Sequence, residues 1–388
     1  MHNRIDLFGI FLRDIPVHRV HEQNRPWSQH RVKKTIVQLL ILGLPLWLGC
    51  VDKVNLTIPA EELPFIIDGF VTDQPGPDTI KISKAFPVDG TYYDRVGVDG
   101  ASLTISDDAG NTDGLLGVGK GLYVTNTLVG TIGRTYTLRG TLPGGISIES
   151  TAERMAPAGN LDSIFYEYTE TENTNTGVVE PGFNVYVNST LGPSSSRRIR
   201  WKFNGTYKLV TDPSLILVPD PNCVLPPDEC PKITLPCAEG CACCVCYASE
   251  RETIPIVSDT RTAGPTSINR TFIRFIPINN YTFNDRYRVE VTQMEISQPV
   301  YDFYFDLKRQ ISNAGSLFQP PFFELNGNVK ALSGGGKVIG VFSAAALTKG
   351  YIYINKSAVP LELVSEAIAG DCRSVVENST TTVPPFWN

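Results

Sequence analysis

The sequence predicts a mainly β protein, with an N-terminal immunoglobulin-like β-sandwich and a second β-rich domain that carries one amphipathic helix. The chain has 388 residues, which is enough for two domains that each bury a core. It contains 33 glycines, 28 prolines and only 19% charged residues, a composition that favours short strands and tight turns. Short runs of alternating apolar and polar residues recur between turn signals, which points to strands with one buried face.

The first predicted domain covers residues 64–155. Turn sequences such as DQPGPD, DDAGN and LPGG divide this region into short apolar runs with no helical periodicity. The acids of DDAGNTDG (107–114) do not have the spacing of an EF-hand loop, so we expect a hairpin turn there. MAPAGN (155–160) is the predicted linker. Strands are expected at 65–71, 79–83, 101–106, 122–125, 135–140 and 146–150.

The second predicted domain covers residues 161–388. Strands are expected at 162–168, 183–189, 197–203, 271–278, 287–296, 337–344 and 351–354. The strand at 197–203 alternates cleanly, which is the pattern of a half-buried strand. We expect its basic residues to face solvent, and the alternative is a basic ligand patch. The apolar residues of this strand are Ile199, Trp201 and Phe203, and the basic ones are Arg198, Arg200 and Lys202.

One helix is predicted from Ser297. Ser297 is a suitable N-cap and Pro299 suits the first turn, while the stretch 313–315 ends the helix. Apolar residues at helical spacing form a stripe, which we expect to pack against the sheet of the second domain. The stripe consists of Val300, Tyr304, Leu307 and Ile311.

The N-terminal region has the pattern of an export signal. Residues 32–49 (VKKTIVQLLILGLPLWLG) contain two lysines and then an apolar run that is short for a membrane span. The following Cys50 completes a lipobox-like Leu-Gly-Cys, although Trp47 stands where leucine is usual. We expect a lipoprotein signal peptide at 32–49, lipidation of Cys50 and a polar tether at 50–63. Residues 1–31 are interpreted as an upstream, non-native extension, with Val32 as the start.

Charge and histidine content exclude several functions for the mature chain. Residues 1–49 hold seven of the 34 Lys and Arg and three of the 40 Asp and Glu, which leaves 27 and 37 and a net charge of −10. A nucleic-acid partner needs a basic footprint and is disfavoured. All four histidines lie in the first thirty residues, so the mature chain cannot form a Ser-His-Asp or Cys-His site. No enzymatic role or cofactor is expected, and a carboxylate pair among Glu167, Glu170 and Glu172 is the alternative.

Eight cysteines remain if Cys50 carries lipid. In an exported chain an even number favours disulfides, whose pairing the sequence does not reveal. An all-thiolate metal site and free redox thiols are the alternatives, although the spacing lacks the paired knuckles of zinc sites. Most of these cysteines lie in a proline-flanked insertion at 219–247. The eight are Cys223, Cys230, Cys237, Cys241, Cys243, Cys244, Cys246 and Cys372.

An ordered series of stretches resembles the Bacteroidota outer-membrane lipoproteins known as domain of unknown function 4249. The series includes IIDGFVTDQPGPDTIKIS, GASLTISDDAGN, GLYVTNTLVGTIGRTYTLRGTLPGGISIEST, LDSIFYEY and YRVEVTQMEISQPVYDFYFDLKRQI. The resemblance implies a lipid-anchored outer-membrane protein that assists a TonB-dependent transporter in uptake or surface capture of an unknown ligand. It defines no site residues. A surface adhesin or glycan binder, using exposed aromatics of the second domain, is the second hypothesis, and a carboxylate-based hydrolase is the third.

Overall fold

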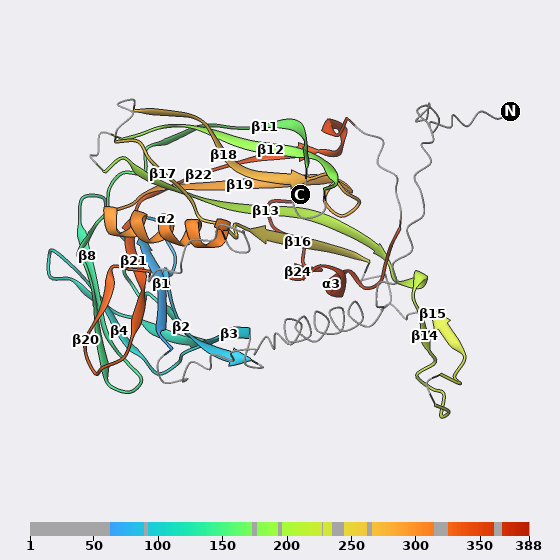
Figure 1. The fold of residues 1–388 in the computed structure, drawn as a ribbon, viewed down its shortest axis with the longest axis horizontal. Coiled ribbons are helices and arrows are strands. Elements are labelled where there is room, and N and C mark those ends of the chain that lie inside the picture. The colour runs from blue at the N-terminus through green and yellow to red at the C-terminus, as the bar shows by residue number, and fades with distance from the viewer. Residues whose placement is uncertain are drawn as a thin grey trace, which may run out of the picture. The chain divides into compact units, whose positions relative to one another are not determined.

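The structure is a computed structural model that describes residues 63–88, 92–172, 177–192, 196–226, 228–234, 244–261, 266–313, 325–360 and 367–387. The predicted signal peptide, Cys50 and most of the tether lie outside these residues. Within the described part of the chain, no helix is long and apolar enough to cross a membrane. Strands dominate these residues, so the prediction of a mainly β fold is confirmed (Figure 1).

Two six-stranded sheets enclose the first core. The core is built from alternating apolar residues such as Ile67, Ile105 and Leu138, all almost completely buried. One sheet has the order β21 (Val338–Ala345), β1 (Phe65–Thr72), β2 (Thr79–Val88), β7 (Leu122–Val124) and β6 (Leu116–Gly119), with β3 (Tyr92–Gly97) paired to β2. The other has the order β20 (Val329–Ser333), β9 (Ile146–Ser150), β8 (Thr135–Leu142), β4 (Ser102–Asp107) and β5 (Thr112–Gly114), with β10 (Glu153–Arg154) paired to β8.

Each of these sheets is completed by a strand from late in the sequence. β21 pairs in parallel with β1, and β20 pairs antiparallel with β9. We predicted residues 337–344 as a strand of the second domain, and that placement is wrong. The side chains of β21 are apolar enough to belong to either core, so only pairing with β1 decides between them. The predicted linker is also packed, because Met155 is fully buried in the first core.

The hairpin predicted at 107–114 is confirmed. The backbone amide of Gly110 donates to the carbonyl of Asp107 at 3.2 Å, which closes the turn between β4 and β5. The Asp107 carboxylate accepts from the backbone amides of Ala109 and Asn111 and from the Asn111 side chain, at 2.8–2.9 Å. These hydrogen bonds hold the pKa of Asp107 below its ordinary value, with the Asn111 side chain as the main cause. The Asp107 carboxylate therefore stabilises the turn by accepting its hydrogen bonds.

A three-stranded and a seven-stranded sheet enclose the second core. Its large residues include Trp201, Phe203, Phe183 and Tyr287. The smaller sheet has the order β11 (Asn160–Glu172), β12 (Val179–Thr190) and β18 (Ser267–Pro277). The larger has the order β22 (Leu347–Asn355), β19 (Arg286–Glu295), β13 (Arg198–Asp212), β16 (Val245–Arg251) and β24 (Ser379–Thr380), with β17 (Ile256–Asp259) and β23 (Ile368–Ala369) paired to β13.

A buried glutamine connects the two sheets of this second core. The Oε1 atom of Gln293 in β19 accepts from Trp201 Nε1 at 2.9 Å and from Ser189 Oγ at 2.5 Å. Its Nε2 atom donates to the carbonyl oxygens of Ala158 and Asn160, at 2.8 and 3.3 Å. Gln293 is fully buried and both of its polar atoms are satisfied, so one side chain ties β12, β13, β19 and the segment before β11 together.

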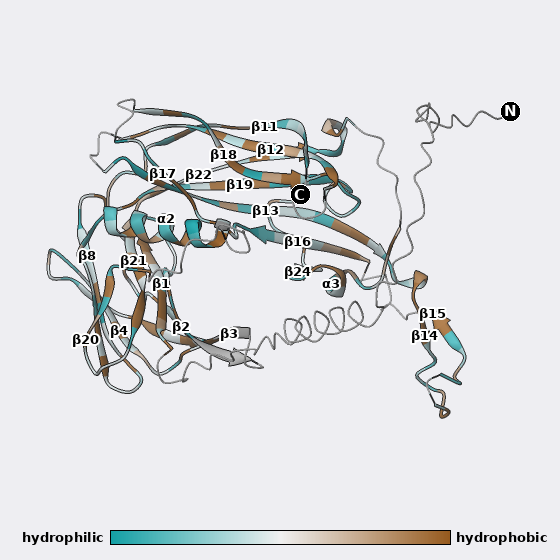
Figure 2. Ribbon diagram, viewed as in Figure 1, coloured by the Kyte–Doolittle hydropathy of each residue, from teal (hydrophilic) through white to brown (hydrophobic). Residues whose placement is uncertain are grey.

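The predicted helix is α2 (Gln298–Asn313), which begins one residue after Ser297. Hydropathy alternates between polar and apolar along its turns, as expected of an amphipathic helix (Figure 2). Of the predicted stripe, Val300 and Tyr304 are buried and Leu307 packs beside them, whereas Ile311 is exposed. The helix packs on β13 and β17 and also on β21 of the first sandwich (Figure 1). It therefore lies between the seven-stranded sheet and the first sandwich, whereas we had predicted contact with the sheet of the second domain.

Smaller elements complete the second half of the described chain. β14 (Leu217–Pro219) and β15 (Lys232–Thr234) form a separate hairpin at the start of the cysteine-rich insertion. The short helix α3 (Cys372–Val375) packs near β13, β16 and β24. Two 3₁₀ turns, η3 (Pro213–Leu215) and η4 (Lys356–Ala358), follow β13 and β22.

Candidate ligand-binding pocket

A cavity of about 720 Å³ lies where α2 meets β1, β13 and β19. This volume is within the range of small-molecule sites, roughly 300–1,000 Å³. We call the cavity the basic pocket. It is lined by Asp68 and Phe70 of β1, Arg200, Lys202, Phe203 and Asn204 of β13, Arg251, Glu252, Thr253 and Pro255 at and after the end of β16, Glu290 and Thr292 of β19, Tyr304 and Leu307 of α2, and Lys349 of β22.

The basic face of β13, predicted to be solvated, is covered instead. Arg198 and Arg200 are 6% and 8% exposed, because α2 and the segment after β16 pack over them. The apolar face is buried as predicted, with Trp201 fully inaccessible. Strand alternation identifies which residues share a face, but it does not show whether another element covers that face. The prediction of a solvated basic face is therefore wrong.

Arg200 is held rigidly at the wall of the pocket. Its Nη2 atom binds Glu252 Oε1 at 3.0 Å, and its guanidinium lies 3.9 Å from the centre of the Tyr304 ring. The other oxygen of Glu252 accepts from the backbone amide of Phe203 at 2.7 Å. Burial raises the pKa of Tyr304 well above its ordinary value, so this phenol stays neutral; its hydroxyl donates to Asp68 at 3.3 Å. The positive charge of Arg200 is thus balanced by Glu252 in the pocket wall.

Lys202 is different, since its ammonium group has no carboxylate within ion-pair distance among the described residues. The Nζ atom lies 3.6 Å from the centre of the Phe70 ring. Burial, together with the nearby charge of Arg200, lowers the pKa of Lys202 to about 8. A buried amine with a lowered pKa at a cavity wall is a common feature of functional sites. The attractive charges of Asp68 and Glu252 only partly offset the loss of solvation.

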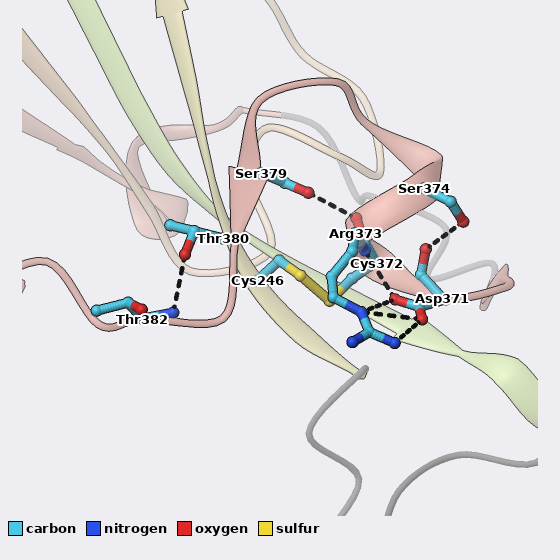
Figure 3. The surroundings of a disulfide bond; sticks show 8 residues. All are labelled: Cys246, Asp371, Cys372, Arg373, Ser374, Ser379, Thr380 and Thr382. Atoms are coloured by element: carbon cyan, nitrogen blue, oxygen red, sulfur yellow. Dashed lines mark hydrogen bonds and ion pairs between the residues drawn. A yellow bond between two sulfur atoms is a disulfide. The ribbon is translucent and has the colours of Figure 1, made fainter. Parts of the chain in front are cut away.

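Two of the predicted disulfides are present in the described residues. Cys223 bonds to Cys230, and Cys246 in β16 bonds to Cys372 in α3 across 126 residues of sequence. Figure 3 shows the second bond, which attaches the C-terminal segment to β16, with Ser379 Oγ donating to the carbonyl of Cys372 at 2.8 Å.

The other predicted cysteines are only partly described. Cys244 is also disulfide-bonded. Cys50, Cys237, Cys241 and Cys243 lie outside the described residues. Within the described ranges no group of three or more metal-ligating side chains occurs.

The candidate carboxylates of the hydrolase hypothesis lie along one strand. β11 continues to Glu172, beyond the strand predicted at 162–168, so Glu167, Glu170 and Glu172 are all strand residues. Glu167 binds Arg270, with its Oε2 atom 2.6 Å from Nη2, and this bond lowers the pKa of Glu167. Glu170 accepts from the Tyr168 hydroxyl at 2.9 Å. Residues 167 and 170 face opposite sides of a strand, so they do not form a facing acid pair.

Three aromatic rings lie side by side across the outer face of the three-stranded sheet. Strand pairing aligns Phe165 with Tyr186 and Tyr186 with Phe272, at centroid distances of 5.6 and 6.0 Å. Phe272 is 50% exposed, and the Arg270 guanidinium lies 4.4 Å from the centre of the Tyr186 ring. We call Phe165, Tyr186 and Phe272 the aromatic row. The sequence predicted exposed aromatics in this half, but only strand register selects these three.

Most of the pocket residues were not identifiable from sequence. Asp68 and Phe70 lie in a strand of the first sandwich, and Lys349 lies in a strand more than 130 residues after β13. Tyr304 was predicted only as part of the packing stripe. The one sequence signal was the row of cations in β13, which we noted as a basic patch but assigned to solvent. The pocket forms because α2 brings these segments together.

Comparisons with known proteins place the chain in a family without an assigned activity. A crystal structure of a DUF4785 family protein from Legionella pneumophila matches with 10% identity and a TM-score of 0.16, over 60% of this chain and 51% of that chain. This chain therefore spans about half of that protein, and no property is carried over from it. No curated protein matches. The family model described as domain of unknown function DUF4249 matches residues 51–350, and because this match covers most of the sequence, the chain belongs to the DUF4249 family.

Proposed function

We propose that the chain is a non-enzymatic lipoprotein of the bacterial outer membrane that captures a small ligand in the basic pocket for a TonB-dependent transporter. The basic pocket carries this proposal, because it is a cavity of small-molecule size whose wall holds a mostly buried cation, Lys202, without an ion-pair partner in the described residues. Its carboxylate Glu252 is engaged with Arg200 and a backbone amide, which favours binding over acid–base chemistry.

Two further observations support an envelope location. The bonds Cys223–Cys230 and Cys246–Cys372 are typical of proteins that fold in an oxidising compartment. The Leu-Gly-Cys sequence at Cys50, preceded by two lysines and an apolar run, supports export and lipidation. A lipid on Cys50 followed by a polar tether would hold the folded residues close to the membrane surface.

The anchor is tested by replacing Cys50 with serine in a bacterium that processes lipoproteins. We expect the wild-type chain in the outer-membrane fraction and the Cys50→Ser variant outside it. A matched control is the double variant C223S/C230S, which also loses thiols but keeps the anchor and should remain in the membrane fraction. Unchanged membrane partitioning of Cys50→Ser would contradict the proposal.

The transporter role is tested by affinity purification of the wild-type chain from detergent-solubilised membranes. We expect a TonB-dependent transporter barrel to co-purify. Its consistent absence, with the chain still in the outer membrane, would contradict the accessory role and leave the lipid anchor intact.

The aromatic row supports a second candidate function, a glycan-binding surface protein. Exposed rings aligned across a sheet present flat apolar faces on which sugar rings stack. A change of Phe272 to alanine removes the most exposed ring, and at about 0.5–1.5 kcal/mol for an aromatic contact we expect two- to tenfold weaker retention on insoluble polysaccharide. Phe305→Ala, an exposed ring on α2, is the control. Equal retention of both variants and the wild type would count against this function.

A further inference from the structure

The charged groups that line the basic pocket do not balance. Glu252 is paired with Arg200, and Glu290 accepts from Arg288, which lies outside the lining, at 2.6 Å. Counting lining side chains gives four cations and three carboxylates, an excess of one positive charge, which becomes two once Arg288 is counted as the partner of Glu290. The cations are Arg200, Lys202, Arg251 and Lys349, and the carboxylates are Asp68, Glu252 and Glu290.

Three of the four cations have no counter-ion among the residues that the structure describes. Among the described residues, Lys202, Arg251 and Lys349 form no ion pair, although they line the same cavity. Arg251 and Lys349 are exposed, so water solvates them, whereas Lys202 is mostly removed from solvent. A buried cation is costly unless it meets an anion. An anionic ligand at Lys202 would remove that cost.

The wall also holds buried polar atoms without hydrogen-bond partners. Asn204 Oδ1 and Arg200 Nε are inaccessible to solvent and unpaired in the described structure. Leaving a buried acceptor unpaired costs about 1–3 kcal/mol. Asn204 Oδ1 accepts hydrogen bonds, so it calls for a ligand that brings a donor such as a hydroxyl group. The carboxylates of Asp68 and Glu290 add further acceptors to the same wall.

We propose that the basic pocket binds a small hydroxylated carboxylate of the sugar-acid class, with the carboxylate at Lys202 and a hydroxyl group donating to Asn204. This inference rests on the proposed ligand capture, for which it names the ligand class. A single carboxylate matches the charge of Lys202, the unpaired lining cation that is mostly removed from solvent, whereas exposed Arg251 and Lys349 are solvated. A phosphate, with a charge of about −1.5 to −2, brings more charge than Lys202 balances. Leu307 and the partly exposed Phe70 line the same cavity and supply apolar surface for the sugar ring.

The lowered pKa of Lys202 makes this binding pH-dependent. Lys202 is charged below pH 8 and loses its charge as the pH rises through that value, so the affinity for a carboxylate should fall there. The pKa of Tyr304 is raised, so that group stays neutral. The charged or titratable groups near Lys202 are Asp68 of β1, Asp78 just before β2, Arg200 of β13, Arg251 and Glu252 near the end of β16, and Tyr304 of α2.

The test is titration calorimetry of the purified full-length chain in detergent at pH 7, with D-glucuronate, D-glucose and inorganic phosphate as probes. Glucuronate carries a carboxylate where glucose carries a hydroxymethyl group, and a hydrogen bond to a charged group contributes about 1.5–3 kcal/mol. We therefore expect glucuronate to bind at least tenfold more tightly than glucose, and more tightly than phosphate. The glucuronate affinity should fall at least tenfold between pH 7 and pH 10, which requires no variant.

Variants then locate the site. Lys202→Met should weaken glucuronate binding at least tenfold and leave glucose binding unchanged, whereas Asn204→Ala should weaken both. Lys81→Met, an exposed lysine of β2 outside the pocket, is the matched control and should change neither. If Lys202→Met does not fold, Lys349→Met serves as the second variant, with an expected loss of about threefold.

Several outcomes would overturn the ligand inference: binding by none of the probes, equal affinity for glucose and glucuronate, tighter binding of phosphate, or an affinity that does not change with pH. Different results would refute the proposed function. Glucuronate binding by a chain that neither partitions with the outer membrane nor purifies with a transporter would leave this inference standing and overturn the envelope role.

Discussion

Replacing Lys202 with methionine should stabilise the ligand-free protein. The pKa of Lys202 is lowered from 10.5 to about 8 by burial, and at 1.36 kcal/mol for each pH unit this corresponds to about 3 kcal/mol of lost stability at pH 7. Methionine has a similar shape and no charge. It gives up the contact of the ammonium with the Phe70 ring, worth about 1–2 kcal/mol. The expected net gain is about 1–2 kcal/mol at pH 7.

The sign of the pH dependence follows from the same pKa. A lysine whose pKa is lower in the folded state destabilises the fold while it is charged, and this penalty disappears as the pH rises from 8 towards 10.5. Between pH 7 and pH 10 the advantage of Lys202→Met over the wild type should therefore shrink by about 2.5 kcal/mol. Other titrating groups are common to both proteins and cancel in the difference.

The assay is guanidinium unfolding of the wild type, Lys202→Met and Lys81→Met at pH 7, 8.5 and 10. Exposed Lys81 should change the free energy of unfolding by less than about 0.5 kcal/mol at every pH. A Lys202→Met protein less stable than the wild type by more than about 1 kcal/mol at pH 7 would refute the account of Lys202 as a strained cation. An advantage that does not vary with pH would refute it as well.

Two further predictions concern the second half of the chain. Removing the Cys246–Cys372 bond by changing both residues to alanine should lower the free energy of unfolding by about 5 kcal/mol on the chain-entropy model, against about 2 kcal/mol for the Cys223–Cys230 bond. The difference arises because the first bond closes a loop of 126 residues and the second a loop of seven. Equal shifts of the denaturation midpoint would contradict this ranking. Gln293→Leu should cost about 3 kcal/mol or more in the same assay, since it leaves several buried groups unpaired, and a loss below 1 kcal/mol would show that the network is not needed.

Local pattern was a reliable guide to the strands and to α2. The runs around Ile67, Ile105 and Leu138 became buried strands, because a two-residue period with turn residues on both sides matches few other structures. The strand predicted at 162–168 was too short. Glu170 and Glu172 lie in β11 because pairing with β12 carries the strand beyond its apolar part. Pairing partners therefore extend strands in ways that composition does not reveal.

The candidate site was only partly accessible to prediction. The cations of β13 were visible as a set, but whether Lys202 faces water depends on α2, which begins 96 residues later. The same holds for the aromatic row, whose rings come from three strands and align only through register. The disulfide partners Cys246 and Cys372 share no local signal either, since they are 126 residues apart.

The sequence by itself determined the β class, the position of the amphipathic helix and the family, because these depend on periodicity and on stretches of neighbouring residues. The tertiary structure alone decided that β20 and β21 complete the first sandwich and that α2 covers the basic face of β13. Burial is a property of the whole fold: an alternating strand looks the same whether its polar face meets water or another element. Lys202 is a mostly buried cation in a pocket because α2 covers its strand, and no feature of that strand by itself shows this.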